Sequence, residues 1–282
     1  MKKAGVIGGG QMGMDIAQLF AKAGMDVVVR DMTDEILAGS KAKLEKSLSK
    51  LVTKGKMTED EKAAIEGKFQ YTTDLQDVKD CDIIVEAIVE NVEVKKSVFK
   101  ELDAICDEKT ILATNTSSIS ITEIASSVKR TGKFIGMHFF NPATVMKLVE
   151  VIRGYETSDE TFNAIYELSK TLGKDPIEVH EGPGFVVNRL LIPMINEAIF
   201  VYSEGIASVE DIDKAMQLGA NHPMGPLALS DLIGNDTVLH IMEVMYNETG
   251  DGKYRPAPLL RKMVRAKKLG RKTGIGFYNY NK

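Results

Sequence analysis

A glycine-rich loop with the spacing G-x-G-x-x-G runs from Gly8 to Gly13. An apolar, strand-like run precedes it, and a helix-like run follows it. In that setting Gly8 permits a tight turn, Gly10 lets a pyrophosphate approach the backbone, and Gly13 lets helix and strand pack closely. The N–H groups at the start of the helix then point at phosphate. The sequence therefore predicts a dinucleotide site contacted by Gly8, Gly10, Gln11, Met12 and Gly13.

Asp31 ends a second apolar run and stands 18 residues after Gly13. A carboxylate at this point accepts hydrogen bonds from the ribose hydroxyls of adenosine and repels a 2′-phosphate. Asp31 therefore predicts NAD in preference to NADP. The neighbouring Arg30 leaves the alternative open, because a guanidinium can bind that phosphate.

His138 is the histidine best placed for acid–base chemistry. It follows the apolar run Phe134–Met137, and the carboxyl ends of parallel strands face the ligand crevice of their sheet. An imidazole there can exchange a proton near neutral pH, although a core histidine with a structural role explains the residue equally well. We expect structural roles for His180, His222 and His240.

Strands must bring these residues together, and the first 180 residues alternate short β-branched runs with helical patterns. We expect strands at Ala4–Gly8, Asp26–Arg30, Asp82–Ile88, Thr110–Thr114, Phe134–Phe139 and Leu148–Ile152. We expect helices at Gln11–Ala23, Asp34–Leu51, Val92–Cys106 and Ser158–Leu172, with a shorter one after Thr58. This alternation predicts an α/β, Rossmann-type domain whose mostly parallel sheet is covered on both faces.

Helical periodicity replaces the strand signal near residue 182. We expect helices at Phe185–Ser203, with a kink or break at Pro193, after Ser208, at Pro226–Glu248 and at Pro258–Lys268. The chain is thus divided into a Rossmann-type domain over residues 1–182 and an all-helical domain over residues 183–282. Phe185–Ser203 is apolar over more than one core-facing stripe, so we expect a second face to be buried, either inside its own domain or, as we favour, against another subunit.

Composition excludes several classes of protein. The chain has 36 Lys and Arg against 40 Asp and Glu, a formal net charge of −4, which argues against a nucleic-acid binder that relies on positive charge. No apolar run reaches the roughly 18 residues that span a bilayer, and the N-terminus does not resemble a secretory signal. Cys81 and Cys106 form no metal-type cluster and suit a reducing compartment, so we expect no metal and a cytoplasmic location.

Several short segments, in unbroken order along the chain, together resemble L-3-hydroxyacyl-CoA dehydrogenases, most closely the bacterial 3-hydroxybutyryl-CoA branch. They are Glu86–Ile88 with Glu90 and Asn91, Asn115–Ser118, His138–Pro142, Pro183–Arg189, Asn221–Pro226 and Lys272–Tyr278.

The resemblance assigns catalytic roles. It implies that His138 is the general acid/base and that Glu150, twelve residues further on, is its partner. A carboxylate bonded to one ring nitrogen fixes the tautomer and stabilises the imidazolium. Ser117 and Asn188 would bind the oxygens of the substrate, Ser117 near the nicotinamide as well.

The resemblance also implies ligand contacts. Cofactor contacts are expected from Glu90, Lys95, Asn115, Ser117, Asn141 and Lys272, and acyl-CoA contacts from Ser47 and Lys54. Lys43, Lys46, Lys50 and Lys54 recur at steps of three, four and four, a stripe that suits the phosphates of CoA. A solvated helix face is the alternative for the stripe. For Lys272, the alternative is surface charge in a run of nine bases between residues 253 and 272.

Together these features imply an NAD-dependent enzyme of fatty acid or butyrate metabolism that interconverts acetoacetyl-CoA and (S)-3-hydroxybutyryl-CoA. The expected assembly is a homodimer through the helical domain, without nucleic-acid or membrane partners. One alternative is a non-enzymatic NAD-binding structural protein, against which the intact set Ser117, His138, Glu150 and Asn188 argues. The other is a CoA-independent 3-hydroxy acid dehydrogenase, whose relatives use a catalytic lysine.

Overall fold

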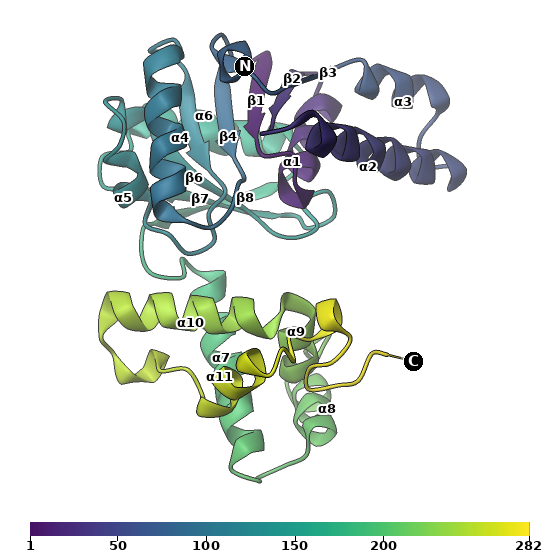
Figure 1. Ribbon diagram of the computed structural model, residues 1–282, viewed down its shortest axis with the longest axis vertical. Helices are drawn as coiled ribbons and strands as arrows, with labels where there is room; N and C mark the ends of the chain where they lie inside the picture. Colours follow the sequence, from purple (N-terminus) through teal and green to yellow (C-terminus); the bar gives the residue numbers. More distant parts are fainter. Residues whose placement is uncertain (282) are drawn as a thin grey trace. The chain divides into compact units, whose positions relative to one another are not determined.

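The computed structural model describes residues 1–281, and the chain splits into two compact units, unit 1 from Met1 to Glu181 and unit 2 from Gly182 onward (Figure 1). Unit 1 contains one sheet in the order β3-β2-β1-β4-β5-β6-β7-β8. The strands are β1 Lys3–Ile7, β2 Asp26–Arg30, β3 Phe69–Thr72, β4 Ile83–Glu86, β5 Ile111–Thr114, β6 Phe134–Phe139, β7 Leu148–Arg153 and β8 Asp175–His180. All neighbours are parallel except β6 and β7, which confirms the mostly parallel sheet.

The six strands expected from apolar runs are present, but two further strands lie at the sheet edges. β3 is only partly buried, and β8 buries only Pro176 and Val179 among its six residues. Neither forms a continuous apolar run, because an edge strand does not bury both of its faces. The sequence pattern therefore does not mark them.

Helices cover both faces of the sheet. The helices of unit 1 are α1 Gln11–Lys22, α2 Asp34–Thr53, α3 Glu59–Glu66, α4 Val92–Ile105, α5 Ile121–Ala125 and α6 Asp159–Thr171, with short 3₁₀ turns η1 Leu75–Val78 and η2 Thr131–Lys133. Apolar residues of α1, α2 and α6 share one core with Val27 and Val29 of β2. On the opposite face, Phe99 of α4 packs edge-on against Phe134, with ring centroids 4.7 Å apart.

Unit 2 is helical: α7 Val187–Ser203, α8 Val209–Gly219, α9 Pro226–Ile233, α10 Asn235–Thr249 and α11 Pro258–Arg265, with 3₁₀ turns η3 Gly252–Tyr254 and η4 Arg271–Thr273. Of the kink or break expected at Pro193, the break is wrong, since α7 runs through the proline. Ile192, Ile195 and Ile199, on both sides of the proline, are buried in the same core, which holds the helix together across the lost hydrogen bond.

The single helix expected at Pro226–Glu248 is also wrong. Gly234 has a φ of 104° and separates α9 from α10. A non-glycine residue is strained at such a φ, so this glycine ends one helix and begins the next. No helix among residues 1–281 is long and apolar enough to cross a membrane.

Candidate functional site

The glycine loop is built by close backbone approaches between β1 and α1. Gly8 has a φ of 106°, and its N–H donates to the Arg30 carbonyl across 2.9 Å. A Cβ at Gly13 would lie 1.8 Å from the Gly8 carbonyl oxygen, whereas a Cβ at Gly10 would meet nothing within 4 Å. Gly13 is therefore required for packing, and Gly10 borders open space.

The start of α1 fits a bound pyrophosphate. Gly10 is its N-cap and supplies no side-chain hydrogen bond to the first turn. Helix N-terminal N–H groups that lack a side-chain cap are suited to a phosphate. Gln11 and Met12 begin the helix at this point, and the Gln11 amide donates to Asp15 over 3.0 Å. The residues present fit a dinucleotide.

Asp31 lies directly beside the loop. Its carboxylate accepts from the Gly9 N–H at 2.6 Å through one oxygen and from the Met32 N–H at 2.6 Å through the other. These bonds fix the acid just past β2, where the ribose is expected. The Arg30 guanidinium donates instead to the Thr73 carbonyl across 3.3 Å.

Sequence reasoning missed Ser40 of α2, which supports the same loop. Its buried hydroxyl donates to the Gly9 carbonyl at 2.6 Å, and a Cβ on Gly9 would lie 2.5 Å from that hydroxyl oxygen. A serine in a helix with no distinctive spacing gives no signal of such a contact.

His138 and Glu150 face one another across the antiparallel pair β6 and β7. They are directly opposed in the β6–β7 register, and His138 Nδ1 lies 2.6 Å from Glu150 Oε2. Both side chains are buried, Glu150 completely. Phe140 stacks obliquely near the imidazole, with ring centroids 4.6 Å apart. A buried carboxylate at this distance can orient the ring and balance its positive charge.

The segment after His138 is held by groups from other elements. The Asn115 side-chain oxygen accepts from the Phe139 N–H at 2.9 Å, and Asp15 accepts from the Ala143 N–H at 2.9 Å. Lys174 donates to the Ala143 and Met146 carbonyls. Asp15 and Lys174 carry no motif and were not predicted. Asn141 lies between these anchors, is exposed and precedes a cis Pro142.

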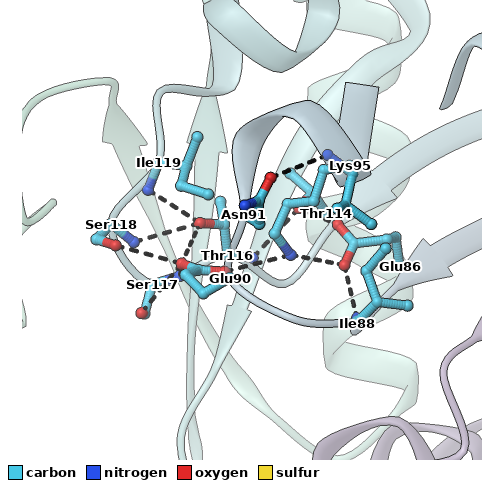
Figure 2. Close-up of polar contacts among 11 residues, drawn as sticks. Glu86, Ile88, Glu90, Asn91, Lys95, Thr114, Thr116, Ser117, Ser118 and Ile119 are labelled. Carbon is cyan, nitrogen blue, oxygen red and sulfur yellow. Dashed lines mark hydrogen bonds and ion pairs between the residues drawn. The ribbon is translucent and has the colours of Figure 1, made fainter. Parts of the chain in front are cut away.

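Ser117 belongs to a loop organised by Glu90 (Figure 2). Glu90 Oε1 accepts from the Thr116 hydroxyl at 2.5 Å, the Ser117 N–H at 2.9 Å, and the Ser117 and Ser118 hydroxyls at 3.3 Å. The Thr116 hydroxyl in turn accepts from the Ser118 and Ile119 N–H groups. One carboxylate oxygen therefore organises the whole turn.

Glu90 is held from the other side by Lys95. Its Oε2 lies 3.2 Å from the Lys95 ammonium. Burial alone raises the pKa of Glu90, but the Lys95 charge and the hydrogen bonds from Thr116 and Ser117 outweigh it and lower that pKa. Lys95 is only 1% exposed, so its ammonium acts on this site chiefly through carboxylates.

The residues expected to contact acyl-CoA lie on α2. Ser47 is exposed on this helix, and Lys54 is exposed at its C-cap. Lys43, Lys46 and Lys50 are exposed as well, as a stripe that binds phosphates requires.

Asn188 and Lys272 belong to unit 2. Asn188 is half-buried in the first turn of α7. The Lys272 ammonium donates to Asp236 of α10 at 2.6 Å, so it is held by a specific acid of its own unit. Residues 1–281 contain no cluster of three or more His, Cys, Asp or Glu side chains arranged for a metal ion.

Comparisons with known proteins agree with this geometry. Residues 3–182 match the family model described as 3-hydroxyacyl-CoA dehydrogenase, NAD binding domain, and residues 184–280 match the corresponding C-terminal domain. The chain is 60% identical to a 3-hydroxybutyryl-CoA dehydrogenase of Clostridioides difficile, over 99% of this chain and 100% of that protein. It is 48% identical to the human mitochondrial hydroxyacyl-coenzyme A dehydrogenase, over 99% and 91% of the two chains.

A solved structure extends the likeness to three dimensions. The crystal structure of (S)-3-hydroxybutyryl-CoA dehydrogenase from Ralstonia eutropha has a TM-score of 0.98 and 52% identity to this chain, over 100% of both chains. The chain belongs to the 3-hydroxyacyl-CoA dehydrogenase family, and its cofactor is NAD.

Proposed function

We propose that the protein interconverts acetoacetyl-CoA and (S)-3-hydroxybutyryl-CoA. The observation that carries the proposal is the 2.6 Å contact between His138 and Glu150, at the carboxyl end of β6 in a domain of an NAD-binding family. The bacterial relatives, which are 3-hydroxybutyryl-CoA dehydrogenases, indicate the substrate class.

His138 handles the proton in both directions. In oxidation, the neutral imidazole accepts the proton of the 3-hydroxyl group; in reduction, the imidazolium returns it to the developing alkoxide. Because Glu150 engages Nδ1, proton exchange with substrate is assigned to Nε2. Glu150 orients the ring and stabilises the imidazolium, as the acid does in a Ser-His-Asp triad.

The cofactor is assigned to the glycine loop and to Asp31, with further contacts from Glu90, Asn115, Ser117, Asn141 and Lys272. When bound, NAD supplies the acceptor or donor of hydride. The Gly8–Gly13 backbone binds the pyrophosphate, and Asp31 orients the ribose and disfavours a 2′-phosphate. Lys95, which was expected to contact the cofactor, is assigned instead to holding Glu90 in place.

Ser117 and Asn188 are assigned to the oxygens of the acyl group. Ser117 is suited to this role because its backbone and hydroxyl are both held by Glu90. Ser47 and Lys54 are assigned to CoA, whose phosphates suit the exposed lysines of α2.

We also propose a homodimer formed through unit 2, in the cytoplasm. Leu190, Ile206 and Leu218 of this unit are 72%, 67% and 77% exposed, and burial of these side chains against a second copy would remove their apolar surface from water. Ile199 is buried in the core of its own unit, so Ile199→Asp tests folding and Leu218→Asp tests assembly. Sedimentation of the wild type as a fully active monomer would exclude the dimer.

The proposed cytoplasmic location is supported by the two buried free cysteines, which suit a reducing compartment.

The substrate proposal is tested by NADH oxidation with acetoacetyl-CoA, with longer 3-ketoacyl-CoAs and with free acetoacetate. We expect acetoacetyl-CoA to give the highest kcat/KM. Equal turnover of free acetoacetate would favour a CoA-independent enzyme. Tight NADH binding without turnover of any substrate would favour a structural protein.

A further inference from the structure

We propose that Glu86 is a positioning residue of the active site: it restrains Lys95 so that Glu90 keeps one oxygen for the Ser117 loop. The effect of Glu86 on the turn does not depend on the proposed function. Only the predicted loss of activity rests on the role proposed above for Ser117. Glu86 is completely buried at the last position of β4, and sequence analysis gave it no role.

The Glu86 carboxylate links the end of β4 to the loop that follows it, to α4 and to β5 (Figure 2). Oε1 accepts from the Ile88 N–H at 2.7 Å and from the Lys95 ammonium at 2.6 Å, and Oε2 accepts from the Thr114 hydroxyl at 2.7 Å. A fully buried carboxylate is costly unless it is paired and hydrogen-bonded. These contacts meet that requirement and fix the carboxylate between β4, β5 and α4.

The Lys95 ammonium lies between two acids at unequal distances, 2.6 Å from Glu86 and 3.2 Å from Glu90. The shorter contact holds the ammonium on the Glu86 side. Lys95 therefore reaches only Oε2 of Glu90, while Oε1 serves the Thr116–Ser118 turn.

Without the charge of Glu86, the ammonium has one carboxylate left to pair with. It then moves onto Glu90, whose two oxygens both become engaged by Lys95 because a charge-assisted bond is stronger than a bond to a neutral hydroxyl. The turn loses its acceptor, and the Ser117 hydroxyl loses its fixed position. Glu86 thus acts on Ser117 indirectly, through Lys95 and Glu90.

The test compares Glu86→Gln with Asp103→Asn by amide hydrogen exchange in the protein without cofactor. Asp103 is the matched control, because it is a largely buried acid on α4, the helix that carries Lys95, and its partners are Arg130 at 2.7 Å and the Lys129 N–H, outside the turn. Glu86→Gln should speed exchange in residues 116–119 by about tenfold or more, while exchange in β1 stays unchanged. Asp103→Asn should leave residues 116–119 as in the wild type.

Unchanged exchange in residues 116–119 of a folded Glu86→Gln protein would overturn the proposal, as would equal acceleration in Asp103→Asn. If Glu86→Gln does not fold, Glu86→Asp replaces it, since the shorter side chain cannot hold Lys95 and Thr114 together, and the same local acceleration is expected.

Kinetics separate this inference from the proposed function. With acetoacetyl-CoA, Glu86→Gln should lower kcat about 10-fold to 100-fold, because Glu86 would no longer keep Ser117 oriented towards the substrate. Faster local exchange with normal kcat would support the positioning of the turn and contradict the catalytic role of Ser117. A wild type without activity would contradict the proposed function and leave the exchange result decisive for Glu86.

Discussion

Two regions at the carboxyl edge of the unit 1 sheet are held in different ways. The glycine loop is held by shape, because a Cβ at Gly13 would lie 1.8 Å from a backbone oxygen. The region around Glu90 is held by charge, with the Lys95 ammonium between two carboxylates. A region held by shape fails through steric clash at any pH, whereas a region held by charge fails when one partner loses its charge.

The largest effect is expected at Gly13. Gly13→Ala forces α1 away from β1, so NADH binding should be lost and the protein should melt at a lower temperature. Fluorescence titration with NADH and thermal melting measure the two effects. Gly10→Ala is the matched variant, since its Cβ meets no protein atom. It should weaken NADH binding and leave the melting temperature unchanged; a lowered melting temperature would contradict the assignment of Gly10 to the ligand.

Removing the charge from the second region comes next. Lys95→Met leaves the buried Glu86 and the partly buried Glu90 without their cation, which should reduce the free energy of unfolding by about 3–5 kcal/mol. Lys96→Met, at the next position of α4, removes a cation 4.0 Å from the exposed Glu93 and should change it by less than about 0.5 kcal/mol. Denaturant unfolding measures both. Equal changes in the free energy of unfolding for Lys95→Met and Lys96→Met would show that burial does not strengthen the contacts of Lys95 with Glu86 and Glu90.

A smaller change is expected at Asp31. Asp31→Ser removes charge-assisted bonds to the ribose, so the Kd for NADH should rise about 10-fold to 100-fold while NADPH binding improves. Asp31→Asn keeps the shape and isolates the contribution of charge. Equal affinity of the wild type for both cofactors would show that Arg30 already outweighs Asp31.

The smallest effect concerns pH. The folded-state pKa of Glu90 is lowered, so its contribution to stability is present above the unfolded value of about 4.3 and is lost as pH falls through the folded pKa. The difference in melting temperature between the wild type and Glu90→Gln should therefore shrink as pH is lowered from 7 towards 3. A difference in melting temperature that stays constant over this pH range would show that the ionisation of Glu90 does not contribute to stability.

These regions also differ in how far the sequence predicts them. The glycine loop is local: strand, turn and helix follow one another, so spacing alone identifies it. The network around Glu86 joins residues 9 and 28 positions apart on separate elements, and no periodicity marks such contacts. The same holds for Ser40 and Asp15.

The His138–Glu150 contact lies between these cases. Each residue stands on a strand that apolar runs predict, but their direct opposition depends on the antiparallel β6–β7 register. That register follows from how the chain turns back after Asn141, and no pattern in the strands specifies it. The resemblance to a family supplied the pairing, whereas the residues alone left His138 open to a structural role.

The proton-carrying role of His138 is tested most directly by the kcat of His138→Gln with acetoacetyl-CoA and NADH. We predict a decrease of roughly 10²–10⁴, the range for general acid–base catalysis, with an unchanged Kd for NADH. Near-normal kcat in a folded His138→Gln protein would contradict the account.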